Sequence, residues 1–390
     1  MTPAARAQAA IELLDTVIIA ARDNGPAADT LIQRYFAARR YAGSKDRRAV
    51  RELVYAVIRA CGERPAGGRA AMLLLAGQDA DLAATFDGSP HGPAPIAADE
   101  PRAAAGVAPA WLTERLAASG LDAAEQGALA GRAPLDIRVN RLKGTPTQIT
   151  EQIAAAEPIA GLPDALRLPA GTDLAPFAGL VEPQDAGSQV VTLAAAPQPG
   201  QQIVDLCAGA GGKTLALAAA MGEQGHILAC DTDRGRLSRL SPRAAQAGVT
   251  IAETRLLNPG RELELLADWQ GRADTVLIDA PCSGTGTWRR NPEARWRLTP
   301  GRIDRLVAMQ ARLLDLGAAL VRPGGALVYV VCSLLDEEGA DQAGAFASRQ
   351  TGWTPAALSL PAGSPRGPGL RLTPASDGTD GFFVARFTAP

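Results

Sequence analysis

The chain has 390 residues, of which 47% are hydrophobic and 21% charged, as in folded proteins of two or three domains. Its formal net charge of −2 gives no general basic character, although a local basic groove for nucleic acid stays compatible with it. Five cysteines without CxxC spacing and two histidines exclude a disulfide scaffold and a Cys/His metal site.

Charged residues interrupt every apolar stretch. Glu12 and Asp15 break the apolar N-terminal region, so no signal peptide is expected. No apolar run approaches the ~20 residues that cross a bilayer. We therefore expect a cytoplasmic protein without a metal or a membrane partner, and by default a monomer.

The first hundred residues are predicted to be helical. Residues 9–21 are apolar on a wide face, and residues 50–58 carry apolar side chains at i, i+3, i+4, i+7 and i+8. Arginines lie mostly off this second face, where they form either a solvated or an RNA-contacting surface: Arg47, Arg48, Arg51 and Arg59. Residues 85–109 are predicted to form a linker because of Pro90, Pro93, Pro95 and Pro101, and a helix over 111–116 and a strand over 137–142 follow.

Strands and helices are predicted to alternate after Ala186. We expect strands over 203–207, 226–230, 275–278 and 326–331, and helices over 215–221, 234–247 and 303–320. This alternation predicts an α/β fold with a parallel sheet covered by helices on both faces. The tail over 370–387 is predicted to close as a hairpin around Asp377 and Gly378.

A glycine-rich turn follows the first of these strands. It contains Asp205, Cys207, Ala208, Gly209, Ala210, Gly211, Gly212, Lys213 and Thr214, and Asp231 ends the next strand. Glycines let the backbone approach a ligand, and a carboxylate at the second strand end accepts hydrogen bonds from ribose hydroxyls. An adenosine-containing ligand fits this pairing.

Three such ligands compete for the turn. A nucleotide-binding P-loop needs glycine where Cys207 stands, and a dinucleotide fingerprint needs a third glycine where Thr214 stands. S-adenosylmethionine sites commonly place an acidic residue before the glycines, and Asp205 supplies one. The segment favours S-adenosylmethionine over the other two.

Two cysteines follow two further strands. Residues 279–286 read Asp-Ala-Pro-Cys-Ser-Gly-Thr-Gly and contain Cys282, while Cys332 ends the strand over 326–331. Ligands of open α/β sheets bind at the carboxyl ends of the strands, so both thiols are expected beside the glycine turn. Cys61 and Cys230 are interpreted as small buried hydrophobic residues.

Covalent catalysis is a role that a thiol at this edge of the sheet can serve. A thiolate that adds to C6 of cytosine moves electron density to C5, which then attacks a methylsulfonium. Asp279, if protonated or sharing a proton, is expected to donate a proton at N3 of the base. Spacing alone does not decide which cysteine is the nucleophile.

In these motifs the chain resembles the Sun/Rsm-type family of RNA cytosine-C5 methyltransferases. The resemblance covers residues 109–390 and rests on 205–214, Asp231, 279–286 with 289–292, and Cys332-Ser333, together with Arg138-Val139-Asn140, Gln184-Asp185, Ser188-Gln189 and residues 380–383. Residues 41–59 resemble the NusB-like helical domain of the ribosomal RNA member.

The resemblance implies a three-part organisation. An all-α NusB-like RNA-binding domain with its linker is expected over 1–105, and a small α+β RNA-binding subdomain over 106–185. A Rossmann-like class I methyltransferase domain is expected over 186–390. The implied substrate is small-subunit (16S) ribosomal RNA rather than tRNA, and the implied methyl donor is S-adenosyl-L-methionine.

The resemblance also implies residue roles. Cys332 is expected to be the nucleophile, Cys282 to assist release of methylated RNA, and Asp279 to lie against the base and the donor. Residues 207–213, Asp231 and Asn258 are expected to hold the donor. Val331 and Asn258 stand where the family usually has Thr and an acidic residue, and they support the alternative of a non-catalytic RNA-binding relative.

Other activities fit the sequence less well. An amino-group methyltransferase favours Asp/Asn-Pro-Pro-aromatic at Asp279, and a dehydrogenase leaves the two cysteines unexplained. The segment from Arg289 to Arg305, with Trp288 and Trp296, is interpreted either as an RNA grip that stacks a base or as a surface helix start.

Overall fold

The computed structural model describes residues 1–390, which form two units. The first contains Met1–Arg132 and Thr287–Thr299, and the second contains Ala133–Gly286 and Pro300–Pro390. Each unit therefore combines two stretches of the chain. The domain boundaries expected from the sequence at residues 105 and 185 stay a prediction.

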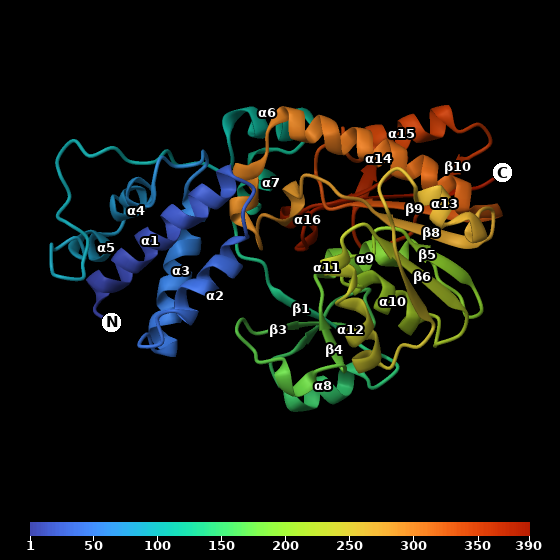
Figure 1. The fold of residues 1–390 in the computed structure, drawn as a ribbon, viewed down its shortest axis with the longest axis horizontal. Coiled ribbons are helices and arrows are strands. Elements are labelled where there is room, and N and C mark those ends of the chain that lie inside the picture. Colours follow the sequence, from blue (N-terminus) through green and yellow to red (C-terminus); the bar gives the residue numbers. More distant parts are fainter. The chain divides into compact units, whose positions relative to one another are not determined.

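The first unit is helical (Figure 1). Apolar faces of its first, third and fourth helices build the core, in which Val50, Val54, Val57 and Ile58 are fully buried. The helices predicted over 9–21 and 50–58 are confirmed, and this all-α region is consistent with a NusB-like domain. Its helices are α1 (Pro3–Arg22), α2 (Ala28–Ala37), α3 (Ser44–Ala60), α4 (Gly68–Ala76), α5 (Ala80–Ala84), α6 (Ala110–Ala118) and α7 (Ala123–Ala128), with the 3-10 turn η4 (Pro292–Arg297).

The second unit begins with a four-stranded antiparallel sheet in the order β2-β3-β1-β4. Its elements are β1 (Leu135–Val139), α8 (Pro146–Gln152), β2 (Glu157–Pro158), β3 (Ala165–Leu168), η1 (Ala175–Phe177) and β4 (Val181–Pro183). Strand β1 was predicted over 137–142 but ends at Val139. There the Asn140 side chain bonds the carbonyl oxygens of Gly179 at 3.0 Å and Ala247 at 2.7 Å, and the chain turns away.

The larger sheet of the second unit has the order β11-β12-β13-β9-β8-β5-β6-β7 (Figure 1). Strands β5, β6, β7, β8 and β9 are parallel, and β13 is antiparallel to β9. The elements are α9 (Ala186–Leu193), β5 (Gln202–Asp205), α10 (Gly212–Ala220), β6 (His226–Asp231), α11 (Arg234–Leu237), α12 (Leu240–Ala247), β7 (Ala252–Leu256), α13 (Glu262–Leu265), η2 (Ala267–Trp269), β8 (Ala273–Asp279), η3 (Thr285–Thr287), α14 (Pro300–Leu320), β9 (Val321–Val331), α15 (Ala340–Arg349), β10 (Thr354–Pro355), β11 (Ser364–Arg366), β12 (Gly369–Leu372), α16 (Pro374–Asp377) and β13 (Phe382–Thr388).

Helices cover both faces of this sheet. Ile203 and Leu277 pack with α9, α10 and α12, whereas their neighbours Val204 and Ile278 pack with α14 on the opposite face. All four side chains are fully buried, as expected for parallel strands between two helical layers. The predicted α/β class with a Rossmann-like sheet is confirmed.

Two predicted elements differ in detail. The helix predicted over 234–247 is divided into α11 and α12, because Pro242 has no N–H to bond the Ser238 carbonyl and is tolerated only in the first turn of a helix. The tail does form an antiparallel pair, β12 with β13, but α16 rather than a tight turn connects the strands.

Candidate active site

Four strand ends of the second unit meet where the strand order reverses. Strand β5 lies between β6 and β8, and β9 continues on the side of β8. Asp205 faces Leu277 in the register of β5 with β8, and Asp279 faces Val330 in that of β8 with β9. Open α/β sheets bind ligands in the crevice that such a reversal creates.

The glycine turn joins β5 to α10 at this edge. Gly211 caps α10 with φ 87°, and a Cβ there would lie 2.6 Å from the Leu240 side chain. Gly209 has φ 56°, and its N–H donates to Asp231 Oδ2 at 2.7 Å. Glycine is required at both positions, and the turn is fixed to the end of β6.

Asp205 is fully buried beneath the turn. Its Oδ2 accepts a hydrogen bond from Thr214 Oγ1 at 2.7 Å, while Oδ1 has no hydrogen-bond partner. Burial raises the pKa of Asp205 to about 7, and the charges of Asp279 and Asp231 add to the increase.

The other residues predicted to hold the donor surround this turn. Asp231 also accepts the Asp233 N–H at 2.7 Å, yet a carboxylate keeps further lone pairs for a ligand. Asn258 is exposed just beyond β7. Burial raises the pKa of the Cys207 thiol, and the charge of Asp205 raises this pKa further.

Lys213 points toward β8. Its Nζ lies 2.6 Å from Asp279 Oδ2, and only 8% of the lysine is exposed. Burial alone would lower the pKa of Lys213, but the charge and hydrogen bond of Asp279, with the charges of Cys332 and Asp205, raise it overall. The site therefore contains an ion pair between a buried lysine and a partly exposed aspartate next to the thiols.

The two strand-end cysteines are in contact. The Sγ atoms of Cys282 and Cys332 lie 3.3 Å apart. The pKa of Cys282 is raised well above its ordinary value, first by the hydrogen bond with Cys332 and then by burial. Cys61 and Cys230 are 0% exposed, which confirms their interpretation as small buried residues.

Motifs singled out in the sequence are joined to one another by hydrogen bonds. Asp185 accepts the Asp380 N–H at 2.9 Å, and Arg138 Nε donates to Gln184 at 2.8 Å. Gly286 N donates to the Cys332 carbonyl at 3.0 Å, and Gly381 N donates to the Gly286 carbonyl at 2.8 Å. A Cβ on Gly286 would lie 2.1 Å from the Gly381 oxygen, so this crossing requires glycine.

Part of the arginine-rich segment is buried, which neither interpretation of it as a surface feature expected. Its residues up to Thr299 belong to the first unit, where Trp288 and Trp296 are buried. Arg295 is 0% exposed and donates to the carbonyl oxygens of Ile58 at 2.6 Å and Cys61 at 2.8 Å, beside the end of α3. Burial lowers the pKa of Arg295 to about 10. Arg295 therefore holds the end of α3, because the last-turn carbonyls of a helix need donors.

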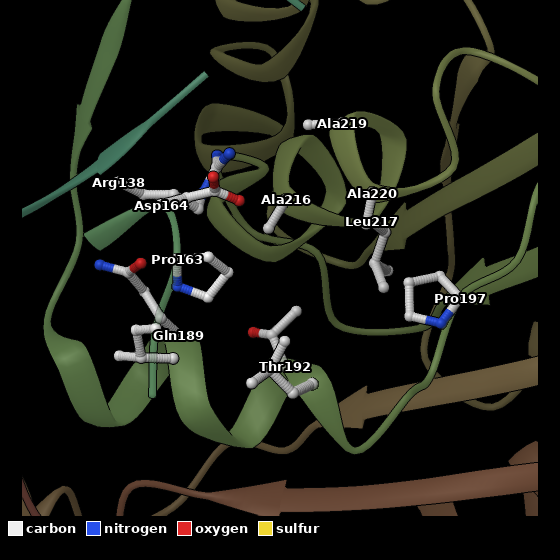
Figure 2. A pocket seen from close by; sticks show the side chains of 12 residues that line it. Arg138, Pro163, Asp164, Gln189, Thr192, Pro197, Ala216, Leu217, Ala219 and Ala220 are labelled. Atoms are coloured by element: carbon white, nitrogen blue, oxygen red, sulfur yellow. The ribbon is translucent and has the colours of Figure 1, made fainter. Parts of the chain in front are cut away.

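One cavity of the second unit lies elsewhere (Figure 2). Pro163 and Gln189 flank it on one side, and Leu217 and Ala220 of α10 on the other. Neither cysteine lines it, nor does any other residue predicted for the site. No helix is long and apolar enough to cross a membrane, and no cluster of three or more His, Cys, Asp or Glu residues could hold a metal ion.

Solved structures share this architecture. The crystal structure of PH0851 matches with a TM-score of 0.76 at 22% identity, covering 99% of both chains. NSun6 from Pyrococcus horikoshii with SFG matches with a TM-score of 0.61 at 20% identity, covering 67% of this chain and 92% of that chain. A methyltransferase homologue from the same organism reaches 25% identity with a TM-score of 0.61, covering 72% and 99%.

Proteins of similar sequence carry the names of ribosomal RNA methyltransferases. A ribosomal RNA small subunit methyltransferase B of Salmonella arizonae is 38% identical over 263 residues, which are 65% of this chain. One of Serratia proteamaculans is 37% identical over 290 residues, 71% of this chain. The chain spans 59% and 65% of their respective lengths. The model of the 16S rRNA methyltransferase RsmB/F family matches residues 192–388, and the chain belongs to this family.

Proposed function

We propose that the chain transfers a methyl group from S-adenosyl-L-methionine to C5 of a cytosine in small-subunit ribosomal RNA, through a covalent bond between Cys332 Sγ and C6. The contact between the Cys282 and Cys332 thiols, next to the Lys213–Asp279 pair, carries this proposal. The relatives named above support the choice of RNA, because they are small-subunit ribosomal RNA methyltransferases.

The residues at the strand ends suit the methyl donor. Its amino group and ribose hydroxyls are hydrogen-bond donors, and the orphan Oδ1 of Asp205 and the carboxylate of Asp231 are acceptors at the same edge. The turn around Gly211 and Gly212 leads into the N-terminus of α10. NSun6, which shares this fold, was solved with SFG, an S-adenosylmethionine analogue. When bound, S-adenosylmethionine supplies an electrophilic methyl group.

Cys332 and the Lys213–Asp279 pair act on different atoms of the base. The Cys332 thiolate adds to C6, and the electron pair moves toward C5 and N3 of the pyrimidine. The negative charge that develops there is neutralised by the proton shared between Lys213 and Asp279. Asp279 thereby acts through a shared proton, one of the two forms expected for it, with Lys213 Nζ 2.6 Å from its Oδ2.

Cys282 acts after methyl transfer. Its thiol touches Cys332 Sγ, and its raised pKa keeps it protonated near neutral pH. From this position it assists elimination of Cys332 from C6, after the C5 proton has been lost. We assign RNA docking to the regions 1–105 and 106–185, with the methyltransferase domain over 186–390, in a monomeric cytoplasmic protein.

The test is methyl transfer by the purified chain to small-subunit ribosomal RNA, followed by mass spectrometry of the nucleosides. The proposal expects 5-methylcytidine from the wild type and none from Cys332→Ala. N4-methylcytidine would refute C5 chemistry. RNA binding without any methylated nucleoside would favour the non-catalytic relative.

A further inference from the structure

A fully buried glutamate lies behind the two cysteines. Glu338 belongs to the connection between β9 and α15, and 0% of it is exposed. Its carboxylate accepts hydrogen bonds from Ser283 N at 2.8 Å, Ser333 Oγ at 2.6 Å and Gln310 Nε2 at 3.1 Å, and also from Ser283 Oγ. These donors are neutral, and a buried carboxylate without a cationic partner is a costly arrangement.

The bonds of Glu338 reach both cysteine loops. Ser283 directly follows Cys282, and Ser333 directly follows Cys332. The two serine hydroxyls also lie 3.1 Å from each other. One side chain thus joins the loop after β8 to the loop after β9 at the residues adjacent to the thiols.

Further bonds stiffen this junction. Thr285 Oγ1 lies 3.2 Å from Ser333 Oγ and accepts the Leu334 N–H at 2.8 Å. Gln310 of α14 also donates to the Pro281 carbonyl at 2.9 Å. The Tyr329 hydroxyl donates to the backbone carbonyl of Glu338 at 2.5 Å, which holds the glutamate from the side of β9.

The charges around the thiols are unequal. The charges of Cys332 and Glu338 act on Cys282, whereas the charge of Cys332 acts on Lys213, whose Nζ lies 2.6 Å from Asp279 Oδ2. The pKa of Cys282 is raised by the hydrogen bond with Cys332, then by burial, and then by the charges of Cys332 and Glu338. Negative charge at Glu338 thus works against a thiolate at Cys282.

We propose that Glu338 is a positioning residue for the reaction: its carboxylate binds the residue after each cysteine and so sets the contact between the two thiols. A consequence is that its charge favours the neutral thiol at Cys282 and leaves Cys332 as the nucleophile. This inference rests on the proposed function and adds to it a residue that touches neither base nor donor.

Two substitutions separate geometry from charge. In Glu338→Gln, the amide oxygen can still accept from Ser283 N, and the amide nitrogen can donate to the serine hydroxyls, which rotate to accept. The junction is thereby kept while its charge is lost. Glu338→Ala removes both, and Glu337→Gln is a control that removes the same charge one residue earlier.

The first measurement is the iodoacetamide alkylation rate of each cysteine, followed by peptide mass spectrometry without RNA or donor. In the wild type we expect Cys332 to react faster than Cys282. Glu338→Gln should narrow this ratio of the two alkylation rates, because it removes one of the charges that raise the pKa of Cys282. Glu337→Gln should leave the ratio unchanged.

The second measurement is turnover on RNA. A misplacement of about 1 Å costs about a hundredfold, so Glu338→Ala should lower kcat by that order with KM for RNA unchanged. A wild-type alkylation ratio in folded Glu338→Gln would overturn the charge role, and wild-type kcat in Glu338→Ala would overturn positioning. If Glu338→Ala does not fold, the kcat of Glu338→Gln decides positioning: with the junction kept, it should stay within about tenfold of wild type, and a larger loss refutes it. If the wild type methylates no RNA, the proposed function fails, yet the alkylation ratio still decides the electrostatic role of Glu338.

Discussion

Cys282 Sγ and Cys332 Sγ lie 3.3 Å apart although 50 positions separate the residues in the sequence. The parallel pairing of β8 with β9, with Asp279 opposite Val330, brings the two strand ends level. Two thiols in contact next to the Lys213–Asp279 ion pair form an arrangement suited to covalent addition and release.

Cys332→Ala should abolish methyl transfer while leaving the fold intact. Alanine fits the half-buried position, but no other group can add to C6, so the rate should fall by at least about a thousandfold. Calorimetric titration with S-adenosylmethionine should give nearly wild-type affinity. Residual activity within tenfold of wild type would exclude Cys332 as the nucleophile.

Cys282→Ala should instead accumulate a covalent RNA–protein adduct. The bond between Cys332 and C6 still forms, but its release is slowed once the neighbouring thiol is gone. A band of RNA and protein resistant to denaturing detergent should appear in the presence of the donor. The double variant Cys282→Ala/Cys332→Ala is the matched control, and an adduct in that variant would contradict the assignment.

Asp205→Asn should change how stability depends on pH. The pKa of Asp205 is raised in the folded state to about 7, above its unfolded value. The folded protein therefore binds the extra proton, and stability is lost as pH rises between these values. Asparagine does not titrate, so the variant lacks this loss. The unfolding free energy of Asp205→Asn minus that of the wild type should therefore rise by on the order of 2 kcal/mol from pH 5 to pH 8.

Denaturant unfolding at the two pH values measures this gain. Asp122→Asn, which changes an exposed helix-capping residue, provides the comparison and should show a much smaller change. An equal effect of Asp205→Asn at both pH values would show that Asp205 is ionised throughout.

Arg295→Met should destabilise the first unit without weakening phosphate contacts. The substitution leaves buried carbonyl groups at Ile58 and Cys61 without their donor, which should cost roughly 3 kcal/mol. Arg48→Ala, on a side chain 76% exposed, should stay within about 0.5 kcal/mol. An unchanged thermal midpoint in Arg295→Met would contradict this assignment, and a salt slope of RNA binding reduced by about one would restore the RNA-grip interpretation.

The parallel strands could be predicted because they are continuous apolar runs buried on both faces. Strand β7 could not, since it pairs with β6 alone at the sheet edge and its sequence Ala-Glu-Thr-Arg-Leu is half exposed. The burial of Arg295 within the segment from Arg289 to Arg305 could not be predicted, because its acceptors are carbonyls of Ile58, Arg59 and Cys61, which no local sequence pattern indicates.

The strand-end residues of the site could be located because parallel topology brings them together. The pairing of Lys213 with Asp279 depends on side-chain direction, which the glycine turn does not encode. Glu338 gave no signal either, because it follows the strand by several residues and its partners come from three separate segments.

The central claim is that the chain methylates C5 of a ribosomal cytosine with Cys332 as the nucleophile that adds to C6. Bisulfite sequencing of RNA from cells with and without this gene, complemented by wild type or Cys332→Ala, tests it most directly. The account predicts one cytosine of small-subunit ribosomal RNA that loses protection in the deletion and regains it only with wild type. Restoration by Cys332→Ala, or no changed cytosine in any RNA, would contradict the account.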